Sequence, residues 1–356
     1  DNKAALVERM VRLGVNVNAR AHDQLTPLHL AAIFIPIRGP DCEATVRALL
    51  QCGANPMLKG GAKDQLVLHM LAGKASTSSL NALNLVLESC PDEARLEADA
   101  EGNIPLLIAV QAGNEGAVQD LLAKLTREQL HFKRLISEDY AIHMATKQKD
   151  IEILKIVIDS GCSLDLQNGK GQTALHLAAA NEMEEFVRLL CQAGADPDVQ
   201  DNEHQSPLHL ATARGYHRIM DILSEKFKAS IMNRTKDGST LMHLASSAYN
   251  ATAALTFIRK GIPIHMPNKE GAKCIHIASI RGHVEVVKAI VAKGESVDCR
   301  TKDGLTPLHL AVKFGQHEVV ETLLGLGANL QLKTGKLGET PLHIATMVKD
   351  GERCVD

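Results

Sequence analysis

The sequence contains sixteen histidines, the side chains best suited to metal binding or proton transfer near neutral pH. An imidazole can also hold hydrogen bonds inside a fold, because it has two ring nitrogens. Seven of these histidines recur at intervals of 33 or 34 residues, at positions 143, 176, 209, 243, 276, 309 and 343. Zinc requires ligands that converge on one point, whereas residues that occur once per interval are spread along the chain. The spacing therefore favours a structural role for these histidines over a metal site or a catalytic pair.

Each recurring histidine ends a four-residue phrase related to Thr-Pro-Leu-His. Complete copies stand at residues 26–29, 306–309 and 340–343, and copies with one change stand at 173–176 and 206–209. Looser copies stand at residues 66–69, 140–143, 240–243 and 273–276. A fixed interval of this length indicates one supersecondary unit that is repeated along the chain. The residues expected to anchor the repeats are Thr26, Pro27, His29, His69, His143, Thr173, His176, Pro207, His209, His243, His276, Thr306, His309, Thr340 and His343.

Residues 303–335 are the clearest copy of the repeat, and they predict two short helices. The Thr306 hydroxyl can cap the first helix, and Pro307 fits the first helical position because its missing N–H would be unpaired there. Gly315 can end this helix, since glycine readily adopts the left-handed conformation that follows a helix. The spacing of apolar residues predicts a second helix over 317–326. Residues 329–335 then form an extended, turn-rich connection to the next repeat.

The phrase and its interval resemble the ankyrin repeat, and the resemblance covers essentially the whole chain. It implies an all-α fold, a solenoid of stacked helix-turn-helix repeats whose connections project as hairpin-like fingers. It also implies that each anchor imidazole hydrogen-bonds to the start of its own repeat and to the neighbouring backbone. On this resemblance, residues 1–22 are the second half of a truncated repeat, 23–137 hold three irregular repeats with insertions, 138–337 hold six regular repeats, and 338–356 belong to a truncated final repeat.

The early repeats depart from the pattern. Residues 33–42 form an insertion after the first predicted helix, and residues 76–84 form a stretch rich in serine and asparagine. Leu107 stands where the third repeat would carry its histidine, and residues 124–134 replace a normal finger. Because long insertions in repeat arrays map to surface loops and often carry function, we expect loops in these places.

Composition and motifs argue against several classes of function. A net charge of −3 is unlike that of a general nucleic-acid binder, and no stretch reaches the ~18 apolar residues of a membrane span. The glycine-containing segments 169–173 and 335–340 do not match the phosphate-binding loop motif. We therefore expect neither an enzyme nor a metal or cofactor site. The eight cysteines show no pairing pattern, which favours reduced thiols and an intracellular protein over disulfides.

The predicted fingers carry many basic residues. If the fingers align along one edge, this edge could attract an acidic polymer or an anionic lipid surface. Acidic residues are interleaved with the basic ones, so the alternative is that these are solvated turn residues. The candidate partner-contact residues are Lys170, Arg234, Lys236, Lys269, Arg300, Lys302, Lys333 and Lys336.

Residues 338–354 (GETPLHIATMVKDGERC) resemble part of the long ankyrin array of TRPN channels, the NompC family of mechanotransduction channels, with residues 348–354 as the distinctive part. This resemblance implies the cytosolic array of a tetrameric, mechanically gated cation channel, on the cytoplasmic side of the plasma membrane. It implies a tether or spring that binds microtubules, and a fragment that is monomeric alone. Both ends of the sequence have the pattern of half repeats, so we expect a longer array.

Two other interpretations stay open. One is a non-channel intracellular scaffold or membrane-skeleton adaptor, which binds proteins on the concave face of the array and carries no load. The other is a different ankyrin-bearing channel, such as a TRPA-type protein. Repeats that continue beyond the last residue and lead into six apolar spans would favour TRPN, whereas an array that soon ends would favour the adaptor.

Overall fold

The computed structural model describes residues 2–38, 40–126, 129–134, 138–249, 251–335 and 337–347. Within these ranges every regular element is a helix, and the only β-type contact is an isolated bridge between Gly60 and Gln65. The expectation of an all-α fold built from paired helices is therefore confirmed. In the same ranges, no helix has the length and apolar character that crossing a bilayer requires.

Contacts divide the chain into two compact parts. The N-terminal unit comprises Asp1–Leu177 and Gln192–Ala195, and the C-terminal unit comprises Ala178–Cys191 and Asp196–Asp356. The N-terminal unit holds α1 (Asn2–Arg12), η1 (His22–Gln24), α2 (Pro27–Arg38), α3 (Pro40–Gln51), α4 (Val67–Ala72), α5 (Thr77–Ser89), η2 (Asp92–Arg95), α6 (Pro105–Gln111), α7 (Glu115–Ala123), η3 (Gln129–His131), α8 (Ala141–Gln148) and α9 (Ile151–Asp159). Helices α10 (Ala174–Ala180) and α11 (Glu184–Gln192) contain the boundaries between the units.

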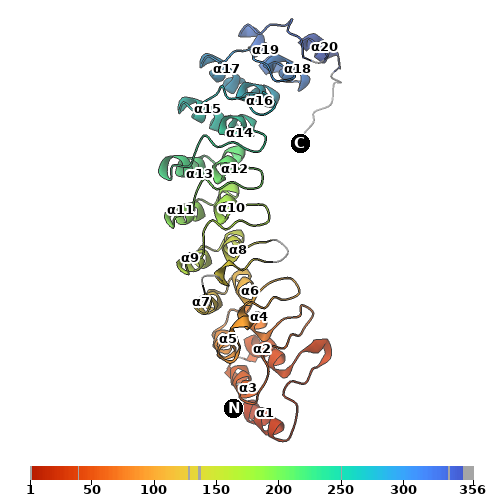
Figure 1. Ribbon diagram of the computed structural model, residues 1–356, viewed down its shortest axis with the longest axis vertical. Coiled ribbons are helices and arrows are strands. Elements are labelled where there is room, and N and C mark those ends of the chain that lie inside the picture. The colour runs from red at the N-terminus through yellow and green to blue at the C-terminus, as the bar shows by residue number, and fades with distance from the viewer. Residues whose placement is uncertain are drawn as a thin grey trace. The chain divides into compact units, whose positions relative to one another are not determined.

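The C-terminal unit continues the same alternation of first and second helices. It holds α12 (Pro207–Arg214), α13 (His217–Asp221), η4 (Ile222–Lys226), α14 (Leu241–Ser247), α15 (Thr252–Arg259), α16 (Cys274–Arg281), α17 (Val284–Ala292), α18 (Pro307–Lys313), α19 (His317–Gly325) and α20 (Pro341–Met347). From α12 to α18, each first helix packs on the second helix of its own repeat and on the first helix of the next. Figure 1 shows the connections that follow the second helices projecting past α12, α14 and α16 as loops. We call these connections the fingers.

The start of α18 shows why the repeated phrase forms a helix. Thr306 has an extended backbone, and its side-chain oxygen accepts a hydrogen bond from the backbone N–H of His309. The ring Nδ1 of His309 in turn accepts one from the backbone N–H of Thr306, at 3.2 Å. Pro307 occupies the first helical position, where its lack of an N–H has no consequence. The phrase thus satisfies two of the amides that a helix start would otherwise leave unpaired.

The expectation of a loop in the first insertion is wrong for residues 33–38. Helix α2 extends through Arg38, and α3 begins at Pro40; residue 39 and the side chains of residues 35–42 lie outside the described part. Pro36 has no N–H to donate to the Ala32 carbonyl, four residues earlier. The Lys74 Nζ donates to the carbonyls of Ala32 at 3.1 Å and Ile33 at 2.8 Å, so a lysine from the next repeat supplies the missing donor.

The serine- and asparagine-rich stretch is also helical rather than a loop. The Ser76 side chain caps α5 by accepting a hydrogen bond from the Ser79 backbone at 3.1 Å, so the polar residues begin the helix. Near residues 124–134, the short helix η3 takes the place of a finger turn and buries Leu130. Leu107, the residue in place of histidine, is fully buried in α6.

One second helix in the C-terminal unit departs from the expected regularity. After α13 the chain forms the π-helix η4, and Lys228 then has a left-handed backbone with a φ of 58°. Glycines take this place in later repeats, at Gly261, Gly294 and Gly327. The Lys260 Nζ contacts the Asp221 and Glu225 carboxylates at 2.9 and 2.6 Å, which ties this irregular segment to the next repeat.

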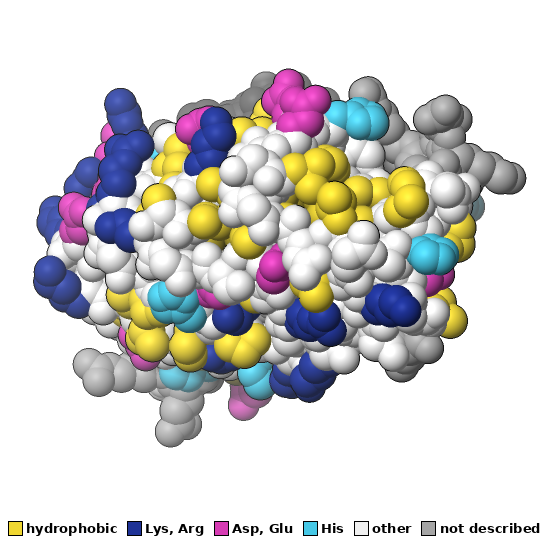
Figure 2. All heavy atoms as spheres, turned by 90° about the horizontal axis from the view of Figure 1, so that it is seen from above, with side chains coloured by type: hydrophobic (Ala, Val, Ile, Leu, Met, Phe, Trp, Pro, Cys, Tyr) yellow, Lys and Arg dark blue, Asp and Glu magenta, His cyan; other side chains and the backbone are white. Residues whose placement is uncertain are grey.

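Exposed hydrophobic side chains surround α18–α20. Large hydrophobic residues that remain exposed here include Leu324, Leu330 and Met347. Figure 2, a view from above relative to Figure 1, shows hydrophobic side chains gathered in the middle of this end, with Lys and Arg side chains along the left and lower parts of the view. Leu342 is 73% exposed, whereas Leu308, at the same place in the preceding repeat, is 1% exposed. The face of α20 that carries Leu342 thus corresponds to the face that packing covers in α18.

Candidate functional site

The recurring histidines use both ring nitrogens inside the fold. In the first copy, the Thr26 backbone N–H donates to the Nδ1 of His29 at 3.2 Å. The Nε2 of the same ring lies 3.1 Å from the Gln65 carbonyl oxygen. Because Nδ1 accepts, Nε2 must carry the proton and donate to the carbonyl. Each such ring therefore joins the start of its repeat to a backbone carbonyl further along the chain, and neither nitrogen remains for a metal ion.

The carbonyl acceptor occupies one of two places. In most copies it belongs to the residue just before the next four-residue phrase, as for Gln65, Asn103, Gln172, Ala272 and Glu339. For His209 and His276 it belongs to Asn233 and Cys299, seven residues before the next phrase. His176 is fully buried and contacts Thr173 in the same way. His343 is exposed on α20, and the contacts that the structure gives for its ring are both with Thr340.

Burial favours the neutral form of six anchor imidazoles. It lowers the pKa of His276 to about 4, and it lowers the pKa values of His29, His69, His143, His243 and His309. Protonation of the ring would add a proton at Nδ1, and this N–H would face the backbone N–H that donates to Nδ1 in the neutral form. The described residues also contain no group of three or more His, Cys, Asp and Glu side chains that is placed to hold a metal ion.

Backbone hydrogen bonds join successive fingers of the C-terminal unit. The N–H of Lys236 donates to the Glu203 carbonyl at 2.9 Å, and the N–H of Lys269 donates to the Asp237 carbonyl at 2.9 Å. The series continues from Lys302 to Glu270 at 2.9 Å and from Gly335 to Asp303 at 2.7 Å. We call these four bonds the finger ladder. Neighbouring fingers are thereby held at fixed positions by bonds that depend on no side chain.

Glycines allow the fingers to approach so closely. Gly304 has a φ of 77°, and a Cβ atom added there would lie 2.5 Å from the backbone nitrogen of Gly335. Gly271 also has a φ of 77°, and its added Cβ would lie 2.8 Å from the backbone nitrogen of Lys302. Real Cβ atoms do not approach other atoms this closely, so a side chain at either place would push the fingers apart.

The predicted partner-contact residues fall into three groups. Lys170, Lys269, Arg300, Lys302 and Lys333 are exposed, and among the described residues none of them has an ion pair. Lys236 is exposed but lies 3.6 Å from the Glu203 carboxylate. Arg234 is half-buried, and its Nη1 donates to the carbonyls of Gly238 at 3.3 Å and Pro267 at 3.0 Å, so it serves the fold. Lys336 lies outside the described residues.

Two lysines on early fingers of the N-terminal unit are neutralised by the next finger. The Lys59 Nζ lies 2.6 Å from the Glu97 carboxylate, and the Lys63 Nζ lies 3.0 Å from the Glu101 carboxylate. Backbone bonds also link these fingers, as from Ala100 to Lys63 at 2.9 Å. Unpaired basic side chains therefore gather on the later fingers, which the sequence alone did not reveal.

A second set of contacts at the far ends of the first helices was not predicted. The Gln316 Nε2 donates to the Ile280 carbonyl at 2.9 Å, and the His283 Nε2 lies 2.9 Å from the Ala248 carbonyl. Asn114 and Lys74 make the same kind of contact in the N-terminal unit, to Ala72 and Ala32. Gln316, His283 and Asn114 each join the start of a second helix to the end of the preceding repeat's first helix, whereas Lys74 joins the turn before α5 to the middle of α2. The recurrence of a polar residue before several second helices, as at Asn114, His283 and Gln316, was the available signal.

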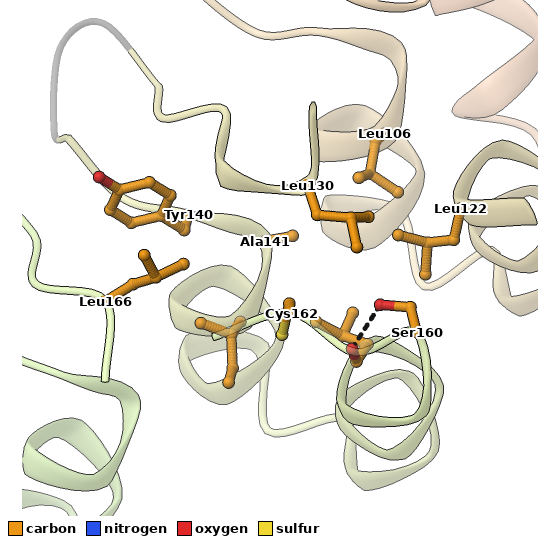
Figure 3. Close-up of a pocket in the computed structure, with 10 residues that line it drawn as sticks. Leu106, Leu122, Leu130, Tyr140, Ala141, Ser160, Cys162 and Leu166 are labelled. Atoms are coloured by element: carbon orange, nitrogen blue, oxygen red, sulfur yellow. Dashed lines mark hydrogen bonds between the residues drawn. The ribbon is translucent and has the colours of Figure 1, made fainter. Parts of the chain in front are cut away.

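The apolar crevice in Figure 3 is not a ligand site. Leu106, Leu122 and Leu130 line one side, and Tyr140, Cys162 and Leu166 line another. The space between these side chains does not admit a water molecule. Cys162 is buried, which raises the pKa of its thiol to about 11. The thiol therefore stays protonated and unreactive at neutral pH.

The other described cysteines are also free thiols, with no disulfide among Cys52, Cys90, Cys162, Cys191, Cys274 and Cys299. Burial raises the pKa of Cys90 to about 11 and those of Cys191, Cys274 and Cys299 to about 12. The side chains of Cys42 and Cys354 lie outside the described part. These thiols fill space in the fold and do not form a redox pair there.

Comparisons with known proteins agree with the repeated architecture. The family model of ankyrin repeats in three copies matches residues 115–201, 142–235, 241–334 and 275–355, and the single ankyrin repeat matches residues 23–60. A search of the curated proteins finds no match, so no relative supports the resemblance to TRPN channels. The helix pairs, the histidine anchors and these matches place the chain in the ankyrin-repeat family, whose repeats mediate protein–protein interaction.

Proposed function

We propose that this chain is a protein-binding ankyrin array that acts as a tether to microtubules, in the manner that its resemblance to TRPN channels implies. Ankyrin repeats are interaction modules and are typically not enzymes. In this proposal the chain lies on the cytoplasmic side of the plasma membrane, is monomeric alone, and becomes tetrameric within a cation channel. The alternative is an intracellular adaptor that binds proteins without bearing load.

The finger ladder is the observation that best supports the proposed tether. Its four bonds, with lengths from 2.7 to 2.9 Å, connect backbone to backbone across successive repeats. Load on one finger therefore passes to the next through the main chain. The histidine anchors also join the start of each repeat to the backbone further along the chain. Because repeats contact only their neighbours, many small interfaces share a displacement and no repeat needs to unfold.

The charge of the later fingers supports an acidic partner. Lys269, Lys302 and Lys333 are exposed, and the ladder holds the backbone of the first two at regular intervals. Fixed, unpaired cations in a row attract an anionic surface and speed encounter with it. We therefore place the partner contact on the later fingers of the C-terminal unit.

Co-sedimentation of the purified chain with assembled microtubules tests this function. The test variant combines Lys236→Glu, Lys302→Glu and Lys333→Glu, and the control variant combines Lys3→Glu, Lys149→Glu and Lys313→Glu, which changes the net charge equally on exposed residues outside the fingers. The wild-type and control chains should pellet with microtubules in low salt, and the finger variant should remain in solution. If the wild-type chain does not pellet, the microtubule tether is wrong and the adaptor becomes the better candidate. Equal binding by both variants would remove the fingers as the contact.

A further inference from the structure

A second hollow lies away from the fingers. It has a volume of about 260 Å³ and is lined by Glu182, Glu184, Tyr216, Arg218 and Ile219, all in the C-terminal unit. Glu182 and Tyr216 belong to the turns between the first and second helices of two consecutive repeats, and Glu184, Arg218 and Ile219 lie at the starts of the second helices α11 and α13. Each first helix begins at a finger and ends at such a turn, so the hollow lies at the opposite end of these helices from the finger ladder.

The chain places a carboxylate here where several other repeats use glycine. Gly113, Gly215, Gly282 and Gly315 follow the first helix in their repeats, with φ values between 64° and 79°, whereas Lys149 takes this place in the preceding repeat with a φ of 61°. Glu182 stands at the same place with a φ of 58°, a conformation that disfavours residues with a side chain. Its carboxylate is exposed, and among the described residues it has no ion pair. The backbone gains nothing from glutamate at this place.

The other residues that line the hollow include charged, apolar and aromatic side chains, and the charged ones are held by ion pairs. The Glu184 Oε1 accepts hydrogen bonds from the Nε and Nη2 of Arg188 at 3.1 and 2.7 Å, and its Oε2 lies 3.8 Å from the Arg218 guanidinium. The Arg188 hydrogen bond lowers the pKa of Glu184, so this carboxylate is charged. Buried Ile219 contributes an apolar surface, and the half-buried Tyr216 contributes an aromatic one.

We propose that this hollow binds a lysine or arginine side chain presented by an extended segment of a protein partner. The methylene stem would lie against Tyr216 and Ile219, since long basic side chains bury their stems on apolar surface. The charged head would meet the unpaired Glu182 carboxylate and the face of the Tyr216 ring, both of which attract cations. Glu184 is already held by two arginines, which leaves Glu182 as the carboxylate available to the partner.

Nuclear magnetic resonance of the 15N-labelled chain tests this site with small probes. N-acetyl-arginine amide and N-acetyl-lysine amide should shift the amide signals of residues 182, 184, 216, 218 and 219 in a saturable way. N-acetyl-norleucine amide, which has a similar stem without the charge, should not. Equal effects of the neutral probe, or shifts confined to other residues, would overturn the proposal.

Two variants assign the binding to Glu182. Glu182→Gly restores the residue that other repeats carry, so it should fold with an unchanged or higher melting temperature while affinity falls about two- to fivefold, the range of a single exposed ion pair. Glu185→Gln removes an exposed neighbouring carboxylate that does not line the hollow, and it should bind as the wild type does. Unchanged affinity in Glu182→Gly would show that its carboxylate is not the recognition group. The result does not depend on microtubule binding, because the two sites lie at opposite ends of the helices.

Discussion

Replacing Gly304 by alanine should break one bond of the finger ladder. Two terms add. The left-handed backbone, with its φ of 77°, costs a residue with a Cβ about 1–2 kcal/mol. The added Cβ would lie 2.5 Å from the Gly335 nitrogen and 3.2 Å from its Cα, so the finger must move and its 2.7 Å bond to the Asp303 carbonyl is lost. A backbone hydrogen bond contributes about 1 kcal/mol net. The expected loss for the repeats around α18–α20 is therefore about 2–3 kcal/mol.

Gly327→Ala is the matched control for this substitution. Gly327 has a φ of 87°, yet a Cβ there would meet nothing within 4 Å. It should show the conformational term alone, about 1–2 kcal/mol. Urea titration and hydrogen exchange of the Gly335 amide measure both variants, and exchange of that amide should accelerate only in Gly304→Ala. Equal destabilisation by the two variants, with the Gly335 amide still protected, would refute the argument from close approach.

Three further predictions concern the anchor His276, the Lys74 contact with α2, and the buried thiols. Stability should fall as the pH drops from 6.5 to about 4, because the folded state lowers the pKa of His276 to about 4 and the unfolded state therefore binds the proton first. This one group accounts for up to ~3 kcal/mol of the free energy of unfolding. His276→Gln should therefore flatten the pH dependence of urea unfolding in that range. Lys74→Met should destabilise the chain by about 1–3 kcal/mol, because the Ala32 and Ile33 carbonyls lose their donor, while Lys124→Met, at an exposed position, should leave the melting temperature unchanged. Cys162, Cys191 and Cys274 are buried and should react with a thiol reagent only in denaturant, since burial raises the pKa of each to about 11 or 12; rapid labelling of any of these three in the native chain would contradict this.

Local chemistry explains what the sequence predicted well. The cap made by Thr306, Pro307 and His309 is complete within four residues, so reading the phrase suffices to place the helix start. Interactions between repeats were harder to foresee. Lys74 supplies the donor that Pro36 lacks in a helix about forty residues earlier, and no local pattern shows that these residues meet. The same holds for Lys59, whose charge is neutralised by Glu97 from the neighbouring finger.

The candidate sites also depend on interactions between repeats, which the sequence did not predict. Counting basic residues suggested one uniform row, but Arg234 is bound by backbone carbonyls while Lys302 remains unpaired and exposed. The difference arises from distances between fingers, which the spacing of residues along the chain does not contain. The hollow beside Glu182 and Tyr216 also lies between two repeats, so neither repeat shows it alone.

The bonds that join the fingers are made by the backbone, whereas a partner would contact the side chains. The finger ladder uses backbone atoms of Lys236, Lys269 and Lys302, so the side chains of these residues are not needed to hold the fingers together. A substitution at one of them can change the charge that a partner meets without removing a bond of the ladder. The same logic applies at the other end of the helices, where Glu182 replaces glycine in a turn that forms with either residue. Partner choice can therefore change at both ends of the helices through side chains alone, whereas the glycines between the fingers cannot change without moving the repeats apart.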